Sequence, residues 1–121
     1  MTHDEIRSLK PGPEMDRAVA IALDYPTHGE EGGRIYQRGP EGAELLPAYS
    51  STWTGLGLVV EAMERRGYLL TASQTMRNSG NNWTAWFNGD VNGLTSTAET
   101  LLEAAASAAL LALAAEKGQR P

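Results

Sequence analysis

From Ser96 to Lys117 the chain reads STAETLLEAAASAALLALAAEK, and the rest of the molecule must pack around this segment. Alanine, leucine and glutamate dominate it, and it holds neither glycine nor proline, which predicts a long α-helix. Ser96 and Glu99 fit a capping box at its start, and Gly118 fits a stop at its end. Because polar side chains form only a thin line, we expect the helix to be covered on more than one side. The apolar run 104–115 is shorter than the roughly 20 residues that cross a bilayer, so we expect a core helix and no membrane association.

The composition describes a small acidic chain. At 121 residues we expect a single domain over 1–121, with residues 1–10 flexible because they are polar and terminal. The 15 acidic and 10 basic side chains give a net charge of −5 and an isoelectric point near 4.9. This balance argues against direct binding to nucleic acid. The lack of cysteine excludes a disulfide framework and a thiolate nucleophile, and the start of the chain lacks the apolar stretch of a signal peptide, so we expect a cytoplasmic protein.

Two further helices are predicted from apolar residues at spacings of three and four. One begins at Pro13, whose ring suits a first helical turn, and ends near Tyr25. The other follows Ser50 or Ser51, either of which can cap a helix, and closes at Gly67.

Three strands are predicted between these helices and the last one. Alternation of apolar and polar residues over 68–75 and 83–88 predicts two strands, and Leu94–Thr95 can supply a brief third. The segment 27–47 is rich in glycine and charge, and we expect a loop there, with Arg34–Gln37 as the only candidate strand. The predicted class is α+β, with helices packed on a small three-stranded antiparallel meander in the order α-(loop)-α-β-β-β-α.

The sequence carries no recognisable catalytic motif. His3 and His28 lie in segments without a metal-ligand spacing, and solvated surface residues are the simpler interpretation. Nucleophile elbows, P-loops and dinucleotide fingerprints are absent. We therefore expect a protein that is not an enzyme and that needs no metal or cofactor.

The aromatic side chains offer the best candidate for a binding surface. If Trp83 and Phe87 face the helices, Trp86 must point to the opposite face of the sheet, where an exposed ring would mark a binding surface or a dimer contact. The alternative is that the segment 27–47 covers it.

A nucleotide site could also be assembled from an aromatic ring that stacks on a base and from backbone amides that hold phosphate. The turn at 77–79 supplies polar donors. Two glycines early in the second helix either expose amides to a ligand or allow close packing against another backbone. The candidate binding residues are Trp53, Gly55, Gly57, Arg77, Asn78, Ser79 and Trp86.

Five short segments resemble a known family. They are LKPGPEMD at 9–16, LPAYSS at 46–51, GY at 67–68, WTAWF at 83–87 and TAET at 97–100. In these pieces the chain is similar to the phage ABA sandwich domain, a family of small phage-encoded proteins. The resemblance implies a phage or prophage origin and brings no catalytic residues.

Charge and resemblance together predict a phage-type accessory protein that acts by binding in the cytoplasm of the host cell. We expect it to inhibit a host defence effector protein through an acidic and aromatic surface. Sequestration of a small nucleotide signal and a role as a structural or assembly module are the alternatives. The nearly all-round apolarity of 96–117 further predicts a homodimer or larger oligomer.

Overall fold

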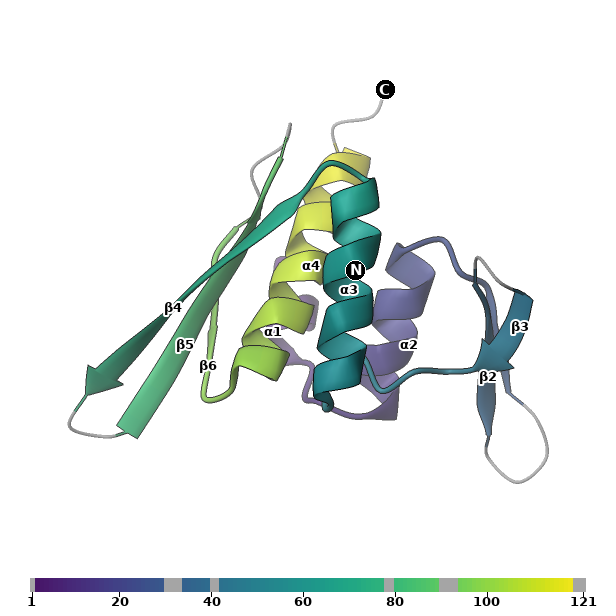
Figure 1. The fold of residues 1–121 in the computed structure, drawn as a ribbon, viewed down its shortest axis with the longest axis horizontal. Helices are drawn as coiled ribbons and strands as arrows, with labels where there is room; N and C mark the ends of the chain where they lie inside the picture. Colours follow the sequence, from purple (N-terminus) through teal and green to yellow (C-terminus); the bar gives the residue numbers. More distant parts are fainter. Residues whose placement is uncertain (1, 30–33, 40–41, 78–79, 90–93, 119–121) are drawn as a thin grey trace.

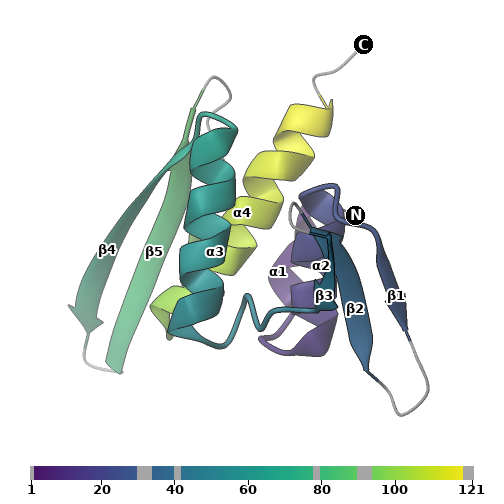
Figure 2. The ribbon, with the colours of Figure 1, turned by 45° about the vertical axis from the view of Figure 1, so that its right-hand side comes forward.

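The helices lie in the middle of the molecule, between two three-stranded antiparallel sheets (Figures 1 and 2). The computed structural model describes residues 2–29, 34–39, 42–77, 80–89 and 94–118. The predicted α+β class is confirmed. The elements in chain order are α1 (His3–Ser8), α2 (Pro13–Ala22), β1 (Thr27–Gly29), β2 (Ile35–Gly39), β3 (Gly42–Leu45), α3 (Trp53–Arg65), β4 (Leu69–Arg77), β5 (Gly80–Asn88), β6 (Ser96–Ala98) and α4 (Leu101–Gly118).

Helix α4 is the centre of the core. Every residue from Ala104 to Leu113 is buried, and the helix touches β5, β6 and all three other helices. One chain therefore buries α4 over this range, and the homodimer or larger oligomer stays a prediction. Within the described ranges, none of the helices combines the length and apolarity that a bilayer-crossing segment needs.

The start of α4 differs from the predicted capping box. Ser96 belongs to β6, where it pairs with Ala85 of β5, so the third strand lies just beyond the predicted Leu94–Thr95. The cap is supplied instead by Thr100, whose Oγ1 accepts a hydrogen bond from the amide of Glu103 at 3.2 Å. Pairing with β5 gives this segment's backbone its hydrogen bonds, which a longer helix would have had to replace.

The sheet β4–β5–β6 follows the predicted alternation. On its inner face, Ala85 and Phe87 are fully buried and Trp83 packs against the core cluster. Trp86 lies on the outer face, opposite Thr71 of β4. The prediction that Trp86 points away from the helices is therefore confirmed.

The N-terminal residues, which were expected to be flexible, form a helix. Thr2 and Glu5 make a reciprocal capping box at the start of α1. Ile6 of this short helix is buried, and α1 contacts α4. The capping box and the burial of Ile6 together stabilise this short helix, although the polar composition of the segment predicts flexibility.

The glycine-rich segment 27–47 also differs from the expected loop, because its described residues form a second sheet. The strand order is β1–β2–β3, and Gln37 of the central strand pairs with Thr27 on one side and Glu44 on the other. The only strand considered for this segment, Arg34–Gln37, overlaps β2. These strands are stabilised by antiparallel backbone pairing. Their sequences show little alternation of apolar and polar residues, which is the pattern that predicts a strand.

A hydrogen-bonded cluster joins the start of α2 to the segment that leads into α3. Ser50 donates from its amide and from Oγ to Asp16 Oδ1, at 2.8 and 2.6 Å, and its Oγ accepts from the amide of Gly12 at 3.0 Å. The prediction of Ser50 or Ser51 as the cap of α3 is therefore wrong. The cap is Thr52, whose Oγ1 accepts a hydrogen bond from the amide of Gly55 at 2.9 Å. The buried carboxylate of Asp16 obtains the hydrogen bonds that burial requires.

Candidate functional site

Among the residues that the structure describes, the two predicted tryptophans, Trp53 and Trp86, do not lie on one surface. Trp53 is 69% exposed at the first position of α3, which packs on the inner side of the sheet β4–β5–β6. Trp86 lies on the outer face of the same sheet, so the two rings are on opposite sides of it. Arg77 ends β4, and Asn78 and Ser79 lie outside the described residues.

The outer face around Trp86 carries uncharged polar side chains that bond to one another. Trp86 Nε1 donates to Asn88 Oδ1 at 3.2 Å, and Asn88 Nδ2 donates to Thr71 Oγ1 at 2.7 Å. The hydroxyl groups of Thr84 and Thr97 share a further hydrogen bond of 3.2 Å. The described residues of this face that bond to Trp86 and its neighbours are uncharged, so they add no acidic group to the predicted aromatic surface.

The two glycines of α3 have different environments. A Cβ at Gly55 would overlap the carbonyl oxygen of Ala48, so the helix approaches another backbone there. The amide of Gly55 is also occupied by the cap at Thr52. Gly57 is exposed and has open space around it. The close-packing interpretation is correct for Gly55, which leaves its amide unable to hold phosphate.

A polar hollow, which we call the tyrosine cleft, lies between α3 and the sheet β1–β2–β3. It encloses about 240 Å³. In Figure 1 the β2–β3 hairpin lies to the right of α3. The chain reaches it from the end of α2, from β2 and β3, from the segment before α3 and from α3 itself; the lining residues are Tyr25, Gln37, Glu44, Tyr49, Leu58, Glu61 and Arg65.

The floor of the tyrosine cleft is a chain of hydrogen bonds. The Tyr49 hydroxyl donates to Gln37 Oε1 at 2.7 Å, and Gln37 Nε2 donates to Glu44 Oε1 at 2.7 Å. Gln37 is only 1% exposed and Tyr49 is buried, so both hydrogen bonds compensate for lost hydration. Burial raises the pKa of Tyr49 to about 12, with smaller contributions from the nearby Tyr25 and Glu44. The hydroxyl therefore stays protonated at neutral pH and fixes the orientation of the Gln37 amide.

The rim of the tyrosine cleft is charged. Glu44 on β3 and Glu61 on α3 are both exposed carboxylates that line the hollow. Arg65 follows Glu61 by one helical turn, and its Nε donates to the carbonyl oxygen of Glu61 at 3.4 Å. Two carboxylates and one guanidinium leave the cleft with a net negative charge.

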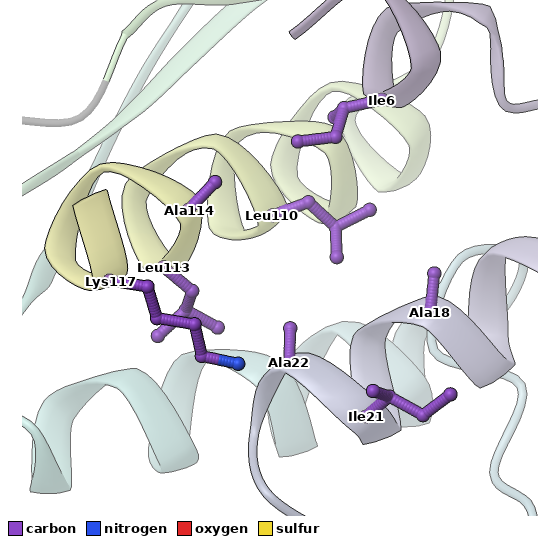
Figure 3. A pocket seen from close by; sticks show the side chains of 8 residues that line it. All are labelled: Ile6, Ala18, Ile21, Ala22, Leu110, Leu113, Ala114 and Lys117. Carbon is purple, nitrogen blue, oxygen red and sulfur yellow. The ribbon is translucent and has the colours of Figure 1, made fainter. Parts of the chain in front are cut away.

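A second hollow, the apolar groove, opens between α2 and α4 and measures about 470 Å³. Figure 3 shows Ala18 and Ala22 pointing from α2 across the groove towards α4, with Ile6 reaching in from α1. Lys117 is its only charged lining residue and lies 4.0 Å from Asp24 Oδ1. The lining residues are Ile6, Ala18, Ile21, Ala22, Leu110, Leu113, Ala114 and Lys117.

Sequence reasoning missed both hollows. The tyrosine cleft joins residues from 25 to 65 through a sheet that was expected to be a loop, and the groove needs the packing of α2 against α4. The buried Gln37 gave no signal, because its strand lacks apolar alternation. Among the described side chains, no three from histidine, aspartate and glutamate lie close enough together to hold a metal ion.

Comparison with known proteins identifies a similar fold. The chain is similar to a phage protein from Bacillus cereus ATCC 14579, known from a 2.0 Å crystal structure, with a TM-score of 0.55 and 20% sequence identity over 87% of this chain and 93% of that one. No protein-family model matches the chain, and no curated protein matches it significantly. The neighbour agrees with the expectation of a phage-type fold, and membership of the ABA sandwich family stays a prediction.

Proposed function

We propose that the protein acts by binding, and that the tyrosine cleft receives a basic side chain of a partner protein. The observation that carries this proposal is the pair of carboxylates, Glu44 and Glu61, placed on two elements beside a buried floor of Tyr49 and Gln37. A guanidinium or ammonium group that leaves water needs several hydrogen-bond acceptors to compensate for its lost hydration. Carboxylate oxygens supply the acceptors, and the aromatic ring of Tyr25 can supply a cation–π contact.

The position of Glu44 is fixed before any partner arrives. Its Oε1 accepts the Gln37 amide, which is itself held by Tyr49, so one wall of the cleft is ordered by buried groups. A preorganised acceptor loses less side-chain entropy on binding than a free surface glutamate does. In this way the buried Tyr49 and Gln37 set the geometry of one acceptor in the cleft.

Arg65 limits what can enter. A ligand with many adjacent cations, such as a polyamine, would be repelled by the guanidinium at the rim, whereas a single basic side chain can reach Glu44 and Glu61. An acidic group beside that side chain would pair with Arg65. The cleft therefore suits one arginine or lysine in a protein surface of mixed charge.

The overall charge favours the same class of partner. A net charge of −5 attracts a basic protein over distances beyond contact and speeds their association. For a protein with a phage-type fold, a host defence effector with a basic nucleic-acid groove is such a partner, and occupation of that groove would inhibit it. For the nucleotide alternative, Trp53 and Trp86 lie on opposite sides of the sheet and the amide of Gly55 is occupied by its cap, while Asn78 and Ser79 lie outside the described residues.

A titration followed by NMR tests the proposal. N-acetyl-arginine amide should shift the ring resonances of Tyr25 and Tyr49 and the amide of Glu61, and the neutral citrulline analogue should not. The shifts should weaken as salt rises, because exposed charges are screened beyond about 8 Å at physiological ionic strength. The double variant Glu44→Gln, Glu61→Gln should lose the response.

Glu64→Gln is the matched control, because Glu64 is an exposed carboxylate on α3 that does not line the tyrosine cleft. It should bind the arginine probe as the wild type does. Equal shifts with arginine and citrulline, or no shift with either, would refute the basic side-chain proposal. A thermal shift produced by nucleotides alone would favour the sequestration alternative.

A further inference from the structure

A further hollow, which we call the polar pocket, lies between β6, the end of α1 and the first turns of α4. It encloses about 260 Å³. In Figure 1, β6 runs beside the start of α4, and both α1 and β6 contact that helix. Residues 95–98 line the pocket on the side of β6, Arg7 lines it from α1, and Glu103 and Ser107 line it from successive turns of α4.

Ser107 brings a buried hydroxyl group without a partner to this pocket. The residue is 5% exposed, and among the described residues its Oγ is the one buried side-chain oxygen or nitrogen that makes no hydrogen bond. A hydroxyl that loses its hydration and gains no hydrogen bond destabilises the folded state. Because it holds no hydrogen bond, it can rotate towards an occupant of the pocket without losing one. An occupant that bonds to Ser107 would remove the cost of its burial.

The pocket is lined by one cation and one anion. Arg7 is exposed and Glu103 is half-buried, and within the described part of the chain neither forms an ion pair. A ligand with a single charge would be attracted by one of these groups and repelled by the other. A ligand with both a carboxylate and an ammonium group can pair with both. The charges therefore favour a zwitterion.

The free edge of β6 adds main-chain groups. Strand β6 is the last strand of its sheet and pairs with β5 on one side. No backbone hydrogen bond joins it to another described segment. Alternate residues of an edge strand turn their N–H and C=O groups away from the neighbouring strand, so part of the backbone of 95–98 is left to bond to an occupant. An amide can donate to a carboxylate, and a carbonyl oxygen can accept from an ammonium group.

We propose that the polar pocket binds a small zwitterion of the α-amino-acid class. Its carboxylate pairs with Arg7, its ammonium group pairs with Glu103, and one of its polar atoms bonds to Ser107 Oγ. The pocket is smaller than the roughly 300–1,000 Å³ of sites for drug-sized ligands, which agrees with an occupant of this size. The inference goes beyond the proposed function, and the polar pocket shares no lining residue with the tyrosine cleft, so either can fail without the other.

An NMR titration with L-alanine tests the inference. L-alanine should cause saturable shifts of the amide resonances of Ser96, Thr97 and Ser107. Lactate, in which a hydroxyl replaces the ammonium group, should not saturate, and neither should L-alaninamide, which lacks the carboxylate. No saturable response to L-alanine would overturn the inference. An equal response to L-alanine and lactate would overturn it as well, because it would assign the pocket to anions in general.

Two variants assign the response to the pocket. Arg7→Gln should weaken L-alanine binding by roughly tenfold or more, the loss expected for one charge-assisted hydrogen bond. Lys10→Gln is the matched control, because Lys10 is an exposed cation nearby in the chain that does not line the pocket, and it should bind as the wild type does.

Ser107→Ala removes the hydroxyl without removing a hydrogen bond to a described residue. The melting temperature without ligand should therefore be kept or raised, while L-alanine binding weakens. A lower melting temperature would show that the hydroxyl is already bonded in the free protein, and would overturn its role as an open partner for the ligand. Unchanged L-alanine binding in Arg7→Gln or in Ser107→Ala would overturn the proposed arrangement.

Discussion

The central strands of the two sheets bury different kinds of side chain. Strand β5 is the middle strand of β4–β5–β6 and buries Phe87 against the helices. Strand β2 is the middle strand of β1–β2–β3 and buries Gln37 instead. A buried phenyl ring stabilises the fold directly, whereas a buried amide is tolerated only when its hydrogen bonds are made.

This difference suggests that the sheet β4–β5–β6 serves mainly stability, and that the sheet β1–β2–β3 serves the proposed binding. The sheet around Phe87 closes the core over α4, with which β5 makes extensive contact. The sheet around Gln37 contributes little apolar surface and instead orders Tyr49 and Glu44 at the tyrosine cleft. We therefore expect changes in the first sheet to alter the free energy of unfolding, and changes in the second to alter binding.

The largest effect should come from Phe87→Ala. Removal of a fully buried ring should lower the free energy of unfolding by about 3–5 kcal/mol, measured by urea denaturation. Trp86→Ala on the next position is the control. It loses one hydrogen bond and a half-buried ring on the outer face and should cost less, about 2 kcal/mol. A larger loss at Trp86 than at Phe87 would reverse the assignment of the two faces.

The next effect concerns the close contact between α3 and the segment that leads into it from β3. Gly55→Ala forces a methyl group against the carbonyl of Ala48 and should destabilise the protein by about 3 kcal/mol, the upper end for overpacking. Gly57→Ala, two residues on and in open space, should instead stabilise the helix by about 0.5–1 kcal/mol. Melting temperatures should therefore move in opposite directions, and a parallel change would contradict the close approach at Gly55.

Alkaline pH should lower the free energy of unfolding through Tyr49, whose hydroxyl is bonded to Gln37 in the sheet β1–β2–β3. The unfolded hydroxyl ionises near pH 10, whereas the folded one keeps its proton up to about pH 12. The stability that is present below pH 10 is therefore lost as the pH rises to 12, by about 2–3 kcal/mol from this group. The difference in unfolding free energy between wild type and Tyr49→Phe isolates it from the other tyrosines. A difference that stays constant from pH 9 to 12 would exclude the raised pKa.

The smallest change in stability should accompany the clearest change in binding. Gln37→Leu makes the inner face of β2 resemble that of β5 and should cost about 1 kcal/mol, since the gain in apolar burial offsets part of the lost hydrogen bonding. Glu44 then loses its fixed donor, and the NMR response to the arginine probe should fall. Gln74→Leu, at an exposed position of β4, should change neither quantity.

The sequence was informative wherever apolar residues repeat. The last helix follows from its composition, the alternation of β4 and β5 follows from periodicity, and the side to which Trp86 points follows from counting residues from Phe87. The capping box at Ser96 failed because pairing with β5 competes with a helical start. The burial of Ile6 shows that one tertiary contact can order a segment whose composition suggests flexibility.

The tyrosine cleft could not be read from the sequence. Its floor joins Gln37, Glu44 and Tyr49 across a sheet whose β2–β3 pairing ends at two glycines, Gly39 and Gly42, where turn residues predict a loop. Hydrogen bonds between side chains leave no periodic trace. Only the register of the strands places Gln37 beside Glu44.

The hydrogen bonds between Ser50 and Asp16 have a consequence for how this protein can change over evolution. Ser50 follows the sheet β1–β2–β3, and Asp16 lies on α2, which precedes that sheet. The hydrogen bonds between them hold both ends of the segment 16–50 together, whatever lies in between. The part of this segment that follows α2 can therefore vary while its ends stay in place. On the proposed function, related chains can diversify or replace the sheet β1–β2–β3, and with it their targets, while the framework around α4 folds unchanged.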